Sequence, residues 1–311
     1  MLIVNCQLPA TISFAYFQTF WLKFKRKIFQ YFTQAFKNPR WFLMFCLTRI
    51  NFLRNLVIFV SRQPVHQIST DGGSLFEELN VEESVKTLRN DGLCLGINLP
   101  RTILDEILEF SGYAIYLGNA DSQFPFSLPE KEREELKCRQ TFVTAHHLNP
   151  SSLCPAVEKV EKDHKLWEIA AQYLETNPVL LSSRLKWTFA VGKTVSENMR
   201  GAFRFHYDLE DYRFIKFFFY LTDVDELSSP HACVKGTHKR KKLRHQFSLI
   251  RERDDNEIIE YYGSNNVETI CGKAGLGFVE DFYCFHKGTL PVYKNRLVLE
   301  VKFAMNDYGF Y

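Results

Sequence analysis

Apolar and polar positions follow two different periods along this chain. Up to residue 174 the apolar residues recur mainly every three or four positions, which predicts helices over residues 81–90, 100–110 and 151–174. Later runs are rich in Phe, Tyr, Val and Leu and are bounded by Gly, Pro, Asn or Asp, which is typical of strands. We expect extended segments at residues 92–99, 179–191, 203–209, 214–221, 232–235, 277–285 and 296–304. Helices followed by many strands predict an α+β chain whose C-terminal half is a sandwich or jelly roll.

The first 60 residues carry a separate helical pattern. Apolar residues between Phe14 and Ala35 recur at helical spacing, with the basic residues largely off this stripe, which predicts an amphipathic basic helix. The next apolar run, residues 41–60, is long enough to span a bilayer, but Arg49 and Arg54 would each cost about 2.5 to 3.5 kcal/mol on insertion. We therefore expect no transmembrane helix. Three interpretations stay open: packing on the body, peripheral attachment of residues 14–60 to an anionic membrane surface, or a cleaved targeting peptide.

A change of composition marks the boundary between this segment and the rest. Residues 64–74 are rich in Gln, Ser, Thr, Asp and Gly, which is typical of a linker. The first acidic residue is Asp71, so nine of the 39 basic residues precede any acidic one, and the remaining 30 face 36 acidic residues. We expect a basic, aromatic-rich helical segment at residues 1–65 and a single domain at residues 66–311.

Composition excludes several classes of protein. With 46% hydrophobic residues and a mean hydropathy of -0.21 over 311 residues, the chain can build a sizeable core and is neither wholly disordered nor a multi-span membrane protein. Its eight cysteines form no CxxC pair, so neither a zinc ribbon nor a dense disulfide framework is indicated, and a reducing, cytoplasmic location fits best. No nucleic-acid-binding module is recognisable.

Two histidines and an aspartate are spaced as metal ligands. His206 and Asp208 lie two positions apart on the predicted strand 203–209, so both side chains leave the same face. His286 stands at the end of another predicted strand, 78 residues after Asp208. Two imidazoles and one carboxylate leave three sites of an octahedral ion open, which is the facial triad of non-haem Fe(II) oxygenases. An α-keto acid can fill two of these sites and dioxygen the third.

Arg296, at the start of the last predicted strand, is the candidate partner of such a keto acid. It alternates with Leu297 and the later apolar residues, so it faces away from the apolar row and toward a cavity. A guanidinium gives a charge-assisted, bidentate clamp for a distal carboxylate. Glu300 and Lys302 share the face of Arg296, so we expect the strand to leave the cavity and meet solvent further on.

Five short motifs together resemble one family. They occupy residues 206–208, 216–225, 230–231, 235–239, and 286–288 followed by Arg296. Over about residues 180–311 they resemble the phytanoyl-CoA dioxygenase family of Fe(II)- and 2-oxoglutarate-dependent oxygenases. The resemblance implies a double-stranded β-helix, or jelly roll, flanked by helices. It also implies iron ligands at His206, Asp208 and His286, and a contact between Arg296 and the C5 carboxylate of 2-oxoglutarate.

The resemblance further implies a reaction. Oxidative decarboxylation of 2-oxoglutarate by O2 would release succinate and CO2 and hydroxylate a small, lipophilic molecule. Halogenating relatives lack the carboxylate ligand, so the presence of Asp208 favours hydroxylation. Tyr207 occupies a position where family members often have a polar residue, which leaves the contacts to 2-oxoglutarate open. Two alternatives remain: a non-catalytic metal- or ligand-binding module of the same fold, and a metal-dependent hydrolase.

Other polar residues carry weaker signals. His231, His238 and His245 lie in predicted turns, and we expect them to be solvated or to brace loops. The basic residues at 239–242 predict a charged loop in solvent; alternatively, they guide an anionic substrate or contact a membrane. The 29 phenylalanines suit a lipophilic substrate but equally a large sandwich core, so the sequence selects no substrate.

Overall fold

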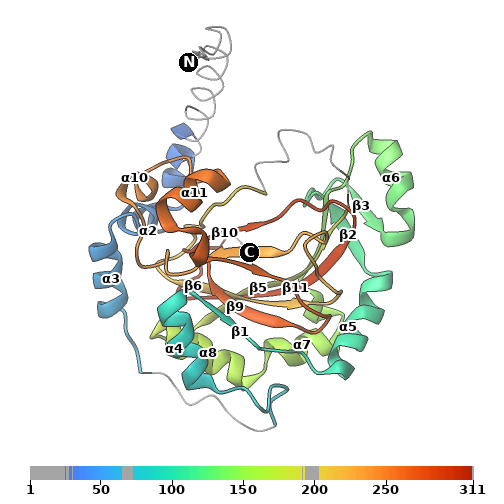
Figure 1. Ribbon diagram of the computed structural model, residues 1–311, viewed down its shortest axis with the longest axis horizontal. Coiled ribbons are helices and arrows are strands. Elements are labelled where there is room, and N and C mark those ends of the chain that lie inside the picture. The colour runs from blue at the N-terminus through green and yellow to red at the C-terminus, as the bar shows by residue number, and fades with distance from the viewer. Residues whose placement is uncertain are drawn as a thin grey trace, which may run out of the picture.

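Two antiparallel sheets form the centre of the molecule (Figure 1). The computed structural model describes residues 25, 28–29, 31–64, 73–190, 192 and 203–309. Most of the predicted stripe 14–35 and of the predicted linker 64–74 lie outside the described residues. Within the described part, the larger sheet has the strand order β1-β9-β6-β11-β5-β4-β2-β3 and the smaller sheet the order β10-β7-β8.

The elements have the following bounds. The larger sheet contains β1 (Leu93–Leu95), β2 (Ile115–Gly118), β3 (Pro125–Ser127), β4 (Thr144–Leu148), β5 (Val179–Thr188), β6 (Phe214–Tyr220), β9 (Gly277–Asp281) and β11 (Arg296–Ala304). The smaller sheet contains β7 (His231–Val234), β8 (Val267–Ile270) and β10 (Phe285–Gly288). The α-helices are α2 (Pro39–Leu47), α3 (Asn51–Val60), α4 (Val81–Asp91), α5 (Arg101–Tyr113), α6 (Lys131–Cys138), α7 (Pro155–Glu161), α8 (His164–Leu174), α10 (Leu243–Gln246) and α11 (Asp255–Tyr262).

Helices cover one face of the larger sheet, and the smaller sheet lies against the other. On β11, Leu297 and Leu299 belong to the largest core cluster, together with apolar residues of α4, α5, α7 and α8. The alternate residue Val298 packs in a second cluster with Cys233 of β7. Because successive side chains of a strand point to opposite faces, the residues of β11 that do not face the helices face the smaller sheet.

The helix α2 packs on the outer side of the smaller sheet, and α3 packs beside it, with Ile58 in the largest core cluster. Phe45 of α2 is buried in a third core cluster with Val234 and Phe285. Arg49 and Arg54 are also buried, and they donate to backbone carbonyls of the body at 2.7 to 3.2 Å. These contacts support packing on the body as the arrangement of both helices. Among the described residues, none forms a helix long and apolar enough to cross a bilayer.

The sheet strands with the clearest patterns are confirmed. The predicted segments 214–221 and 232–235 correspond to β6 and β7, and the segment 296–304 is β11 without a shift. The predicted helices 81–90 and 100–110 correspond to α4 and α5. The pattern did not reveal α6, α11 or the short strands β2, β3, β4 and β8.

Three predicted elements are wrong as single units. The helix 151–174 divides into α7 and α8, because the carboxylate of Asp163 caps α8 and accepts from the N–H of Lys165 at 3.0 Å. The strand 277–285 divides into β9 and β10, which belong to different sheets, at a turn in which Asp281 accepts from the N–H of Tyr283 at 2.8 Å. The strand 203–209 is reduced to isolated bridges at Phe205 and His206.

Candidate metal centre

Backbone pairing brings the three predicted ligands together. The N–H of His206 donates to the carbonyl of His286 at 2.9 Å, and the N–H of His286 donates back at 2.8 Å. The two residues are therefore direct cross-strand neighbours, and their ring centroids lie 4.5 Å apart. The N–H of Asp208 donates to the carbonyl of Phe282 at 2.9 Å, and this bond fixes the position of the segment two residues after His206. As a result, one ligand atom from each of His206, Asp208 and His286 lies within 4.8 Å of the other two.

Local hydrogen bonds fix which nitrogen of each imidazole is available. Nδ1 of His206 lies 2.9 Å from the carbonyl oxygen of Arg204, and Nδ1 of His286 lies 3.0 Å from that of Cys284. A carbonyl oxygen only accepts, so both Nδ1 atoms carry the proton and both Nε2 atoms keep a free lone pair. Burial lowers the pKa of His286 well below its ordinary value, which keeps this imidazole neutral. A neutral ring with a free Nε2 atom, as in His286, is suited to bind a metal ion.

The carboxylate of Asp208 is held in its ionised form. Burial alone would raise its pKa, but the neighbouring Lys216 ammonium keeps the pKa well below its usual range. Nζ of Lys216 lies 3.6 Å from the Asp208 carboxylate and 3.7 Å from the centre of the Phe282 ring. The acidic ligand is thus charged and oriented before any ion binds.

A cavity of about 240 Å³, called here the polar cavity, opens beside these ligands. Basic side chains that line it are Arg184, Lys186, Lys216 and Arg296, and acidic ones are Asp208 and Glu300. Glu300 accepts from Nε of Arg184 at 2.7 Å and lies 3.7 Å from Nζ of Lys186. Arg184 and Lys186 overcome the effect of burial and lower the pKa of Glu300. The surplus of positive charge suits an organic dianion.

Arg296 lines this cavity, and its guanidinium is held in place by the body. One terminal nitrogen donates to the carbonyl of Ser229, and the other lies 3.4 Å from Oγ1 of Thr188. The Nε atom is buried without a hydrogen-bond partner, and the whole side chain is only 6% exposed. A buried donor without a hydrogen-bond acceptor lowers the stability of the folded protein. Because the guanidinium of Arg296 lines the cavity together with three other basic side chains, the residues present fit a keto-acid ligand.

The expectation that β11 meets solvent beyond Arg296 is wrong. Glu300 is 6% exposed and Lys302 is 5% exposed, because the rest of the body continues to cover this face of the strand. Glu300 faces the polar cavity, and Lys302 forms an ion pair with Glu210. The same face therefore stays buried along the strand, and its charges are neutralised by partners.

Tyr207 does not face the polar cavity. Its side chain is fully buried on the opposite side of the segment, and its hydroxyl lies 3.0 Å from the carbonyl of His245 and 3.1 Å from that of Gln246. The residue between the first histidine and the aspartate is therefore part of the core around α2 and the smaller sheet. Its aromatic character has no direct bearing on a ligand in the cavity.

The prediction for His231 is wrong. This residue lies on β7 instead of in a turn, lines the polar cavity and is bonded through Nε2 to Glu280 at 2.5 Å. His238 braces a turn as predicted, but it is buried, with Nε2 3.1 Å from the carbonyl oxygen of Arg89. His245 lies on α10 instead of in a turn and is buried, with Nε2 2.9 Å from Glu257. Within the basic run 239–242, Lys241 is also buried.

Sequence reasoning missed Lys216, Lys186 and His231 as cavity residues. Lys216 is the only charged residue in β6, whose sequence is otherwise Phe, Ile and Tyr. A lone charge in the centre of an apolar strand costs free energy unless it has a buried partner, and this is the signal that could have identified it. Lys186 and His231 carry no comparable signal, because their partners lie on strands distant in sequence.

Comparison with known proteins adds evidence at the level of the fold. No protein-family model matches this chain, and no curated protein matches its sequence. The epimerase SnoN, crystallised in complex with Fe3+, alpha ketoglutarate and nogalamycin RO, is similar with a TM-score of 0.50 at 12% identity, over 74% of this chain and 87% of that chain. EctD from S. alaskensis, in its apoform, is similar with a TM-score of 0.50 at 12% identity, over 78% of this chain and 81% of that chain. The chain shares the fold of these two proteins.

Proposed function

We propose that this protein is an Fe(II)/2-oxoglutarate-dependent dioxygenase that hydroxylates a small apolar molecule and releases succinate and CO2. The observation that carries the proposal is the cluster of His206, Asp208 and His286 on the wall of a cavity that also holds Arg296. The fold shared with SnoN, which binds Fe3+ and alpha ketoglutarate, supports it. The two packed antiparallel sheets support a double-stranded β-helix, and the motifs support kinship with the phytanoyl-CoA dioxygenase family.

Each residue of the site has a distinct task in this proposal. His206, Asp208 and His286 hold the iron on one side and leave the other side open. Arg296 would bind the C5 carboxylate of 2-oxoglutarate through its guanidinium. When bound, iron and 2-oxoglutarate together supply the oxidising power for hydroxylation. Phe282, whose ring centroid lies 4.1 Å from that of His286, keeps water away from this ligand.

Anaerobic spectroscopy tests the proposal directly. Fe(II) and 2-oxoglutarate added to the full-length protein without oxygen should produce a weak visible charge-transfer band from the chelate. Protein loaded with Zn(II) is the control, since this ion has no redox chemistry and should give no band. Stoichiometric iron without a band would reject the oxygenase and favour a binding module or a hydrolase.

The scattered cysteine pattern supports a cytoplasmic location for the enzyme.

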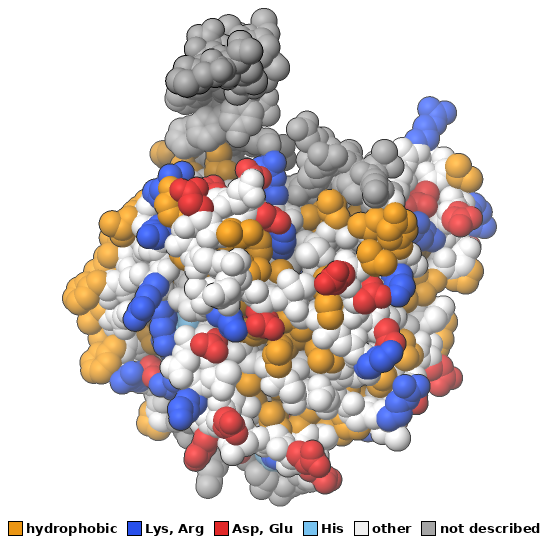
Figure 2. All heavy atoms as spheres, viewed as in Figure 1, with side chains coloured by type: hydrophobic (Ala, Val, Ile, Leu, Met, Phe, Trp, Pro, Cys, Tyr) orange, Lys and Arg blue, Asp and Glu red, His pale blue; other side chains and the backbone are white. Residues whose placement is uncertain are grey.

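Residues 14–60 would also contact an anionic membrane surface. Within the described part of this segment, Phe32, Phe36, Phe52 and Phe59 are all more than half exposed. Figure 2 shows apolar side chains gathered at the edge of the molecule where α3 lies. Aromatic side chains beside exposed basic ones suit the headgroup region of a bilayer.

Vesicle sedimentation tests this membrane contact. Full-length protein should sediment with phosphatidylserine vesicles more than with phosphatidylcholine vesicles. The double variant Phe52→Ser, Phe59→Ser should lose most of that binding, because two exposed aromatic anchors are removed. Leu136→Ser on α6 is the matched control, since Leu136 is equally exposed on another helix. Equal loss in the control, or no loss in the double variant, would contradict the proposal.

A further inference from the structure

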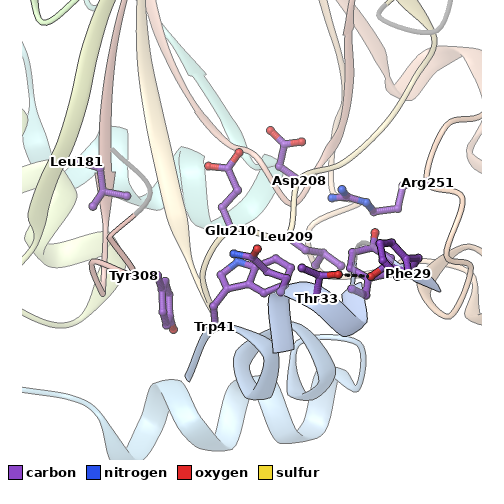
Figure 3. A pocket seen from close by; sticks show the side chains of 11 residues that line it. Phe29, Thr33, Trp41, Leu181, Asp208, Leu209, Glu210, Arg251 and Tyr308 are labelled. Carbon is purple, nitrogen blue, oxygen red and sulfur yellow. Dashed lines mark hydrogen bonds between the residues drawn. The ribbon is translucent and has the colours of Figure 1, made fainter. Parts of the chain in front are cut away.

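A second cavity, of about 580 Å³, lies beside the polar cavity and shares Asp208 with it. Its walls include residues from both ends of the described chain: Tyr31 and Trp41 near the N-terminus and Tyr308 near the C-terminus (Figure 3). Asn38 joins the two ends, because its side-chain amide donates to the carbonyl of Tyr308 at 2.6 Å. The volume is in the range of pockets that enclose a small organic molecule. This second space is called here the apolar cavity.

The lining away from Asp208 is mainly aromatic and aliphatic. The Tyr31 and Trp41 rings stack with centroids 6.5 Å apart, and Trp41 stacks on Phe45 at 5.2 Å. Phe45 is itself part of a buried core cluster, so this wall is anchored to the body. Leu181 of β5 and Leu209 complete the apolar lining. Such a surface binds the hydrocarbon part of a ligand, since burial of apolar area is favourable by about 25 cal/mol per Å².

Arg251 is the cation that lines the apolar cavity in the described part of the chain, and its charge acts on Asp208 without a direct ion pair. Arg251 donates from one terminal nitrogen to the carbonyl of Tyr207 at 2.9 Å, while its Nε is buried without a hydrogen-bond partner. No carboxylate in the described part of the chain forms an ion pair with it, although the neighbouring Arg253 lies 3.5 Å from Glu257. Figure 3 shows the guanidinium of Arg251 extending toward the side of the cavity where Asp208 lies.

The carboxylates that line the same cavity are already neutralised. Glu210 forms an ion pair with Lys302, and Asp208 lies 3.6 Å from Nζ of Lys216 and is a proposed metal ligand. The half-buried guanidinium of Arg251 is therefore the polar group of this cavity that still requires a partner. A ligand with one anionic group would satisfy it through a charge-assisted hydrogen bond.

We infer that the apolar cavity is the prime-substrate pocket and that it selects an amphiphile with an apolar body and one anionic group held by Arg251. The role of the bound molecule as a substrate rests on the proposed function, whereas its binding in the apolar cavity does not. Because Asp208 lines both cavities, a molecule in this pocket lies next to the metal centre. The aromatic wall comes from residues 31–41, so the N-terminal segment, which lies outside the family resemblance, contributes to substrate selection.

Calorimetric titration of the full-length protein, without added metal or 2-oxoglutarate, tests the inference. The probes are dodecanoate, dodecyl phosphate and dodecanol, each below its micelle concentration. The two anionic probes should bind more tightly than dodecanol, and the tighter of the two identifies the preferred anion. Arg251→Gln should weaken binding of the anionic probes at least about tenfold and change dodecanol binding less than twofold. Arg133→Gln, on the exposed surface of α6, is the matched control and should change nothing.

Two results would overturn the inference. One is the absence of binding by both anionic probes, and the other is unchanged anionic binding in Arg251→Gln. A second variant, Leu181→Trp, fills the cavity from β5 and should weaken all three probes; full binding in a folded variant would place them elsewhere. If the probes bind but the charge-transfer band is absent, the proposed oxygenase activity is rejected and the proposed pocket is retained. If the band is present but the probes do not bind, the proposed pocket is rejected and the proposed oxygenase activity is retained.

Discussion

Asp208 lies on the wall of two cavities with opposite character. The polar cavity is built largely from strands of both sheets, and its charged residues include Arg184, Lys186 and Arg296. The apolar cavity takes its aromatic wall from the N-terminal segment and the last described residues. Buried charges need partners at fixed distances, which hydrogen-bonded strands provide, whereas apolar surface needs only close contact. The difference teaches that paired strands fix most of the charged side chains of the polar cavity, whereas residues 29–41 and Tyr308 supply aromatic surface to the apolar cavity.

The largest expected effect comes from Asp208 itself. Asp208→Ala should lower iron affinity by at least about 100-fold and abolish turnover, because one of three protein ligands is lost. Metal analysis after anaerobic ultrafiltration measures the bound iron. Asp105→Ala, an exposed residue of α5 paired with Arg101, is the control. Stoichiometric iron in Asp208→Ala would remove this residue from the ligand set.

Several residues of the polar cavity could be predicted, because the patterns that indicate them lie within short stretches of the sequence. The alternation around Arg296 follows from strand geometry, and Arg296 lines the cavity as this pattern indicates. His206 and Asp208 also line it, although their segment forms only isolated bridges. His231 and Lys186 could not be predicted, because each faces the cavity only through pairing with distant strands. The division of residues 277–285 between two sheets depends on one side-chain hydrogen bond of Asp281, which no hydrophobic period reports.

A second large effect is expected where α3 meets the body. Nη2 of Arg54 lies 3.8 Å from the buried carboxylate of Asp281, and its guanidinium carbon lies 4.0 Å from the centre of the Tyr283 ring. Arg54→Ala would leave that carboxylate without its cation and should cost about 3 to 5 kcal/mol of unfolding free energy, measured in urea. Arg62→Ala, which removes an exposed ion pair of the same segment, should cost less than about 1 kcal/mol.

This pair of variants decides how firmly α3 is attached to the body. An equally small loss in both would show that α3 is only loosely attached, as an appendage would be. The sequence could not settle the point, because an arginine in an apolar helix predicts a buried ion pair and an interfacial helix equally well. Only the position of Asp281, more than 200 residues later in the chain, distinguishes them.

A smaller effect is expected for the keto-acid clamp. Arg296→Ala should weaken 2-oxoglutarate binding by about 2 to 5 kcal/mol and leave iron binding unchanged, because the distal carboxylate loses its charged partner. Titration of the charge-transfer band with 2-oxoglutarate measures the affinity, and Arg133→Ala is the control. Unchanged affinity would assign the carboxylate to Arg184 or Lys186, the other cations of the polar cavity.

The smallest effect concerns the C-terminal wall of the apolar cavity. Asp211 is buried, accepts from the N–H of Asn306 at 2.7 Å and lies 3.3 Å from the hydroxyl of Tyr308. Burial raises its pKa to about 6, above the ordinary value of about 3.9. The folded state therefore holds this proton more tightly than the unfolded chain. The contribution of the protonated Asp211 carboxyl to the free energy of unfolding is complete below about pH 4 and is lost as the pH rises through about 6.

Asp211→Asn should remove that loss, since an amide does not ionise. Between pH 4 and pH 8, the wild type should lose about 2 to 3 kcal/mol of unfolding free energy relative to this variant, measured by urea titration at each pH. The exposed neighbour Asp307→Asn should follow the wild type. Parallel curves for Asp211→Asn and the wild type would show that the buried carboxyl is ionised at no cost. The wall at Tyr308 would then be as stable at pH 8 as at pH 4. Ionisation of Asp211 would in that case not lower the affinity of the apolar cavity for dodecanoate as the pH rises.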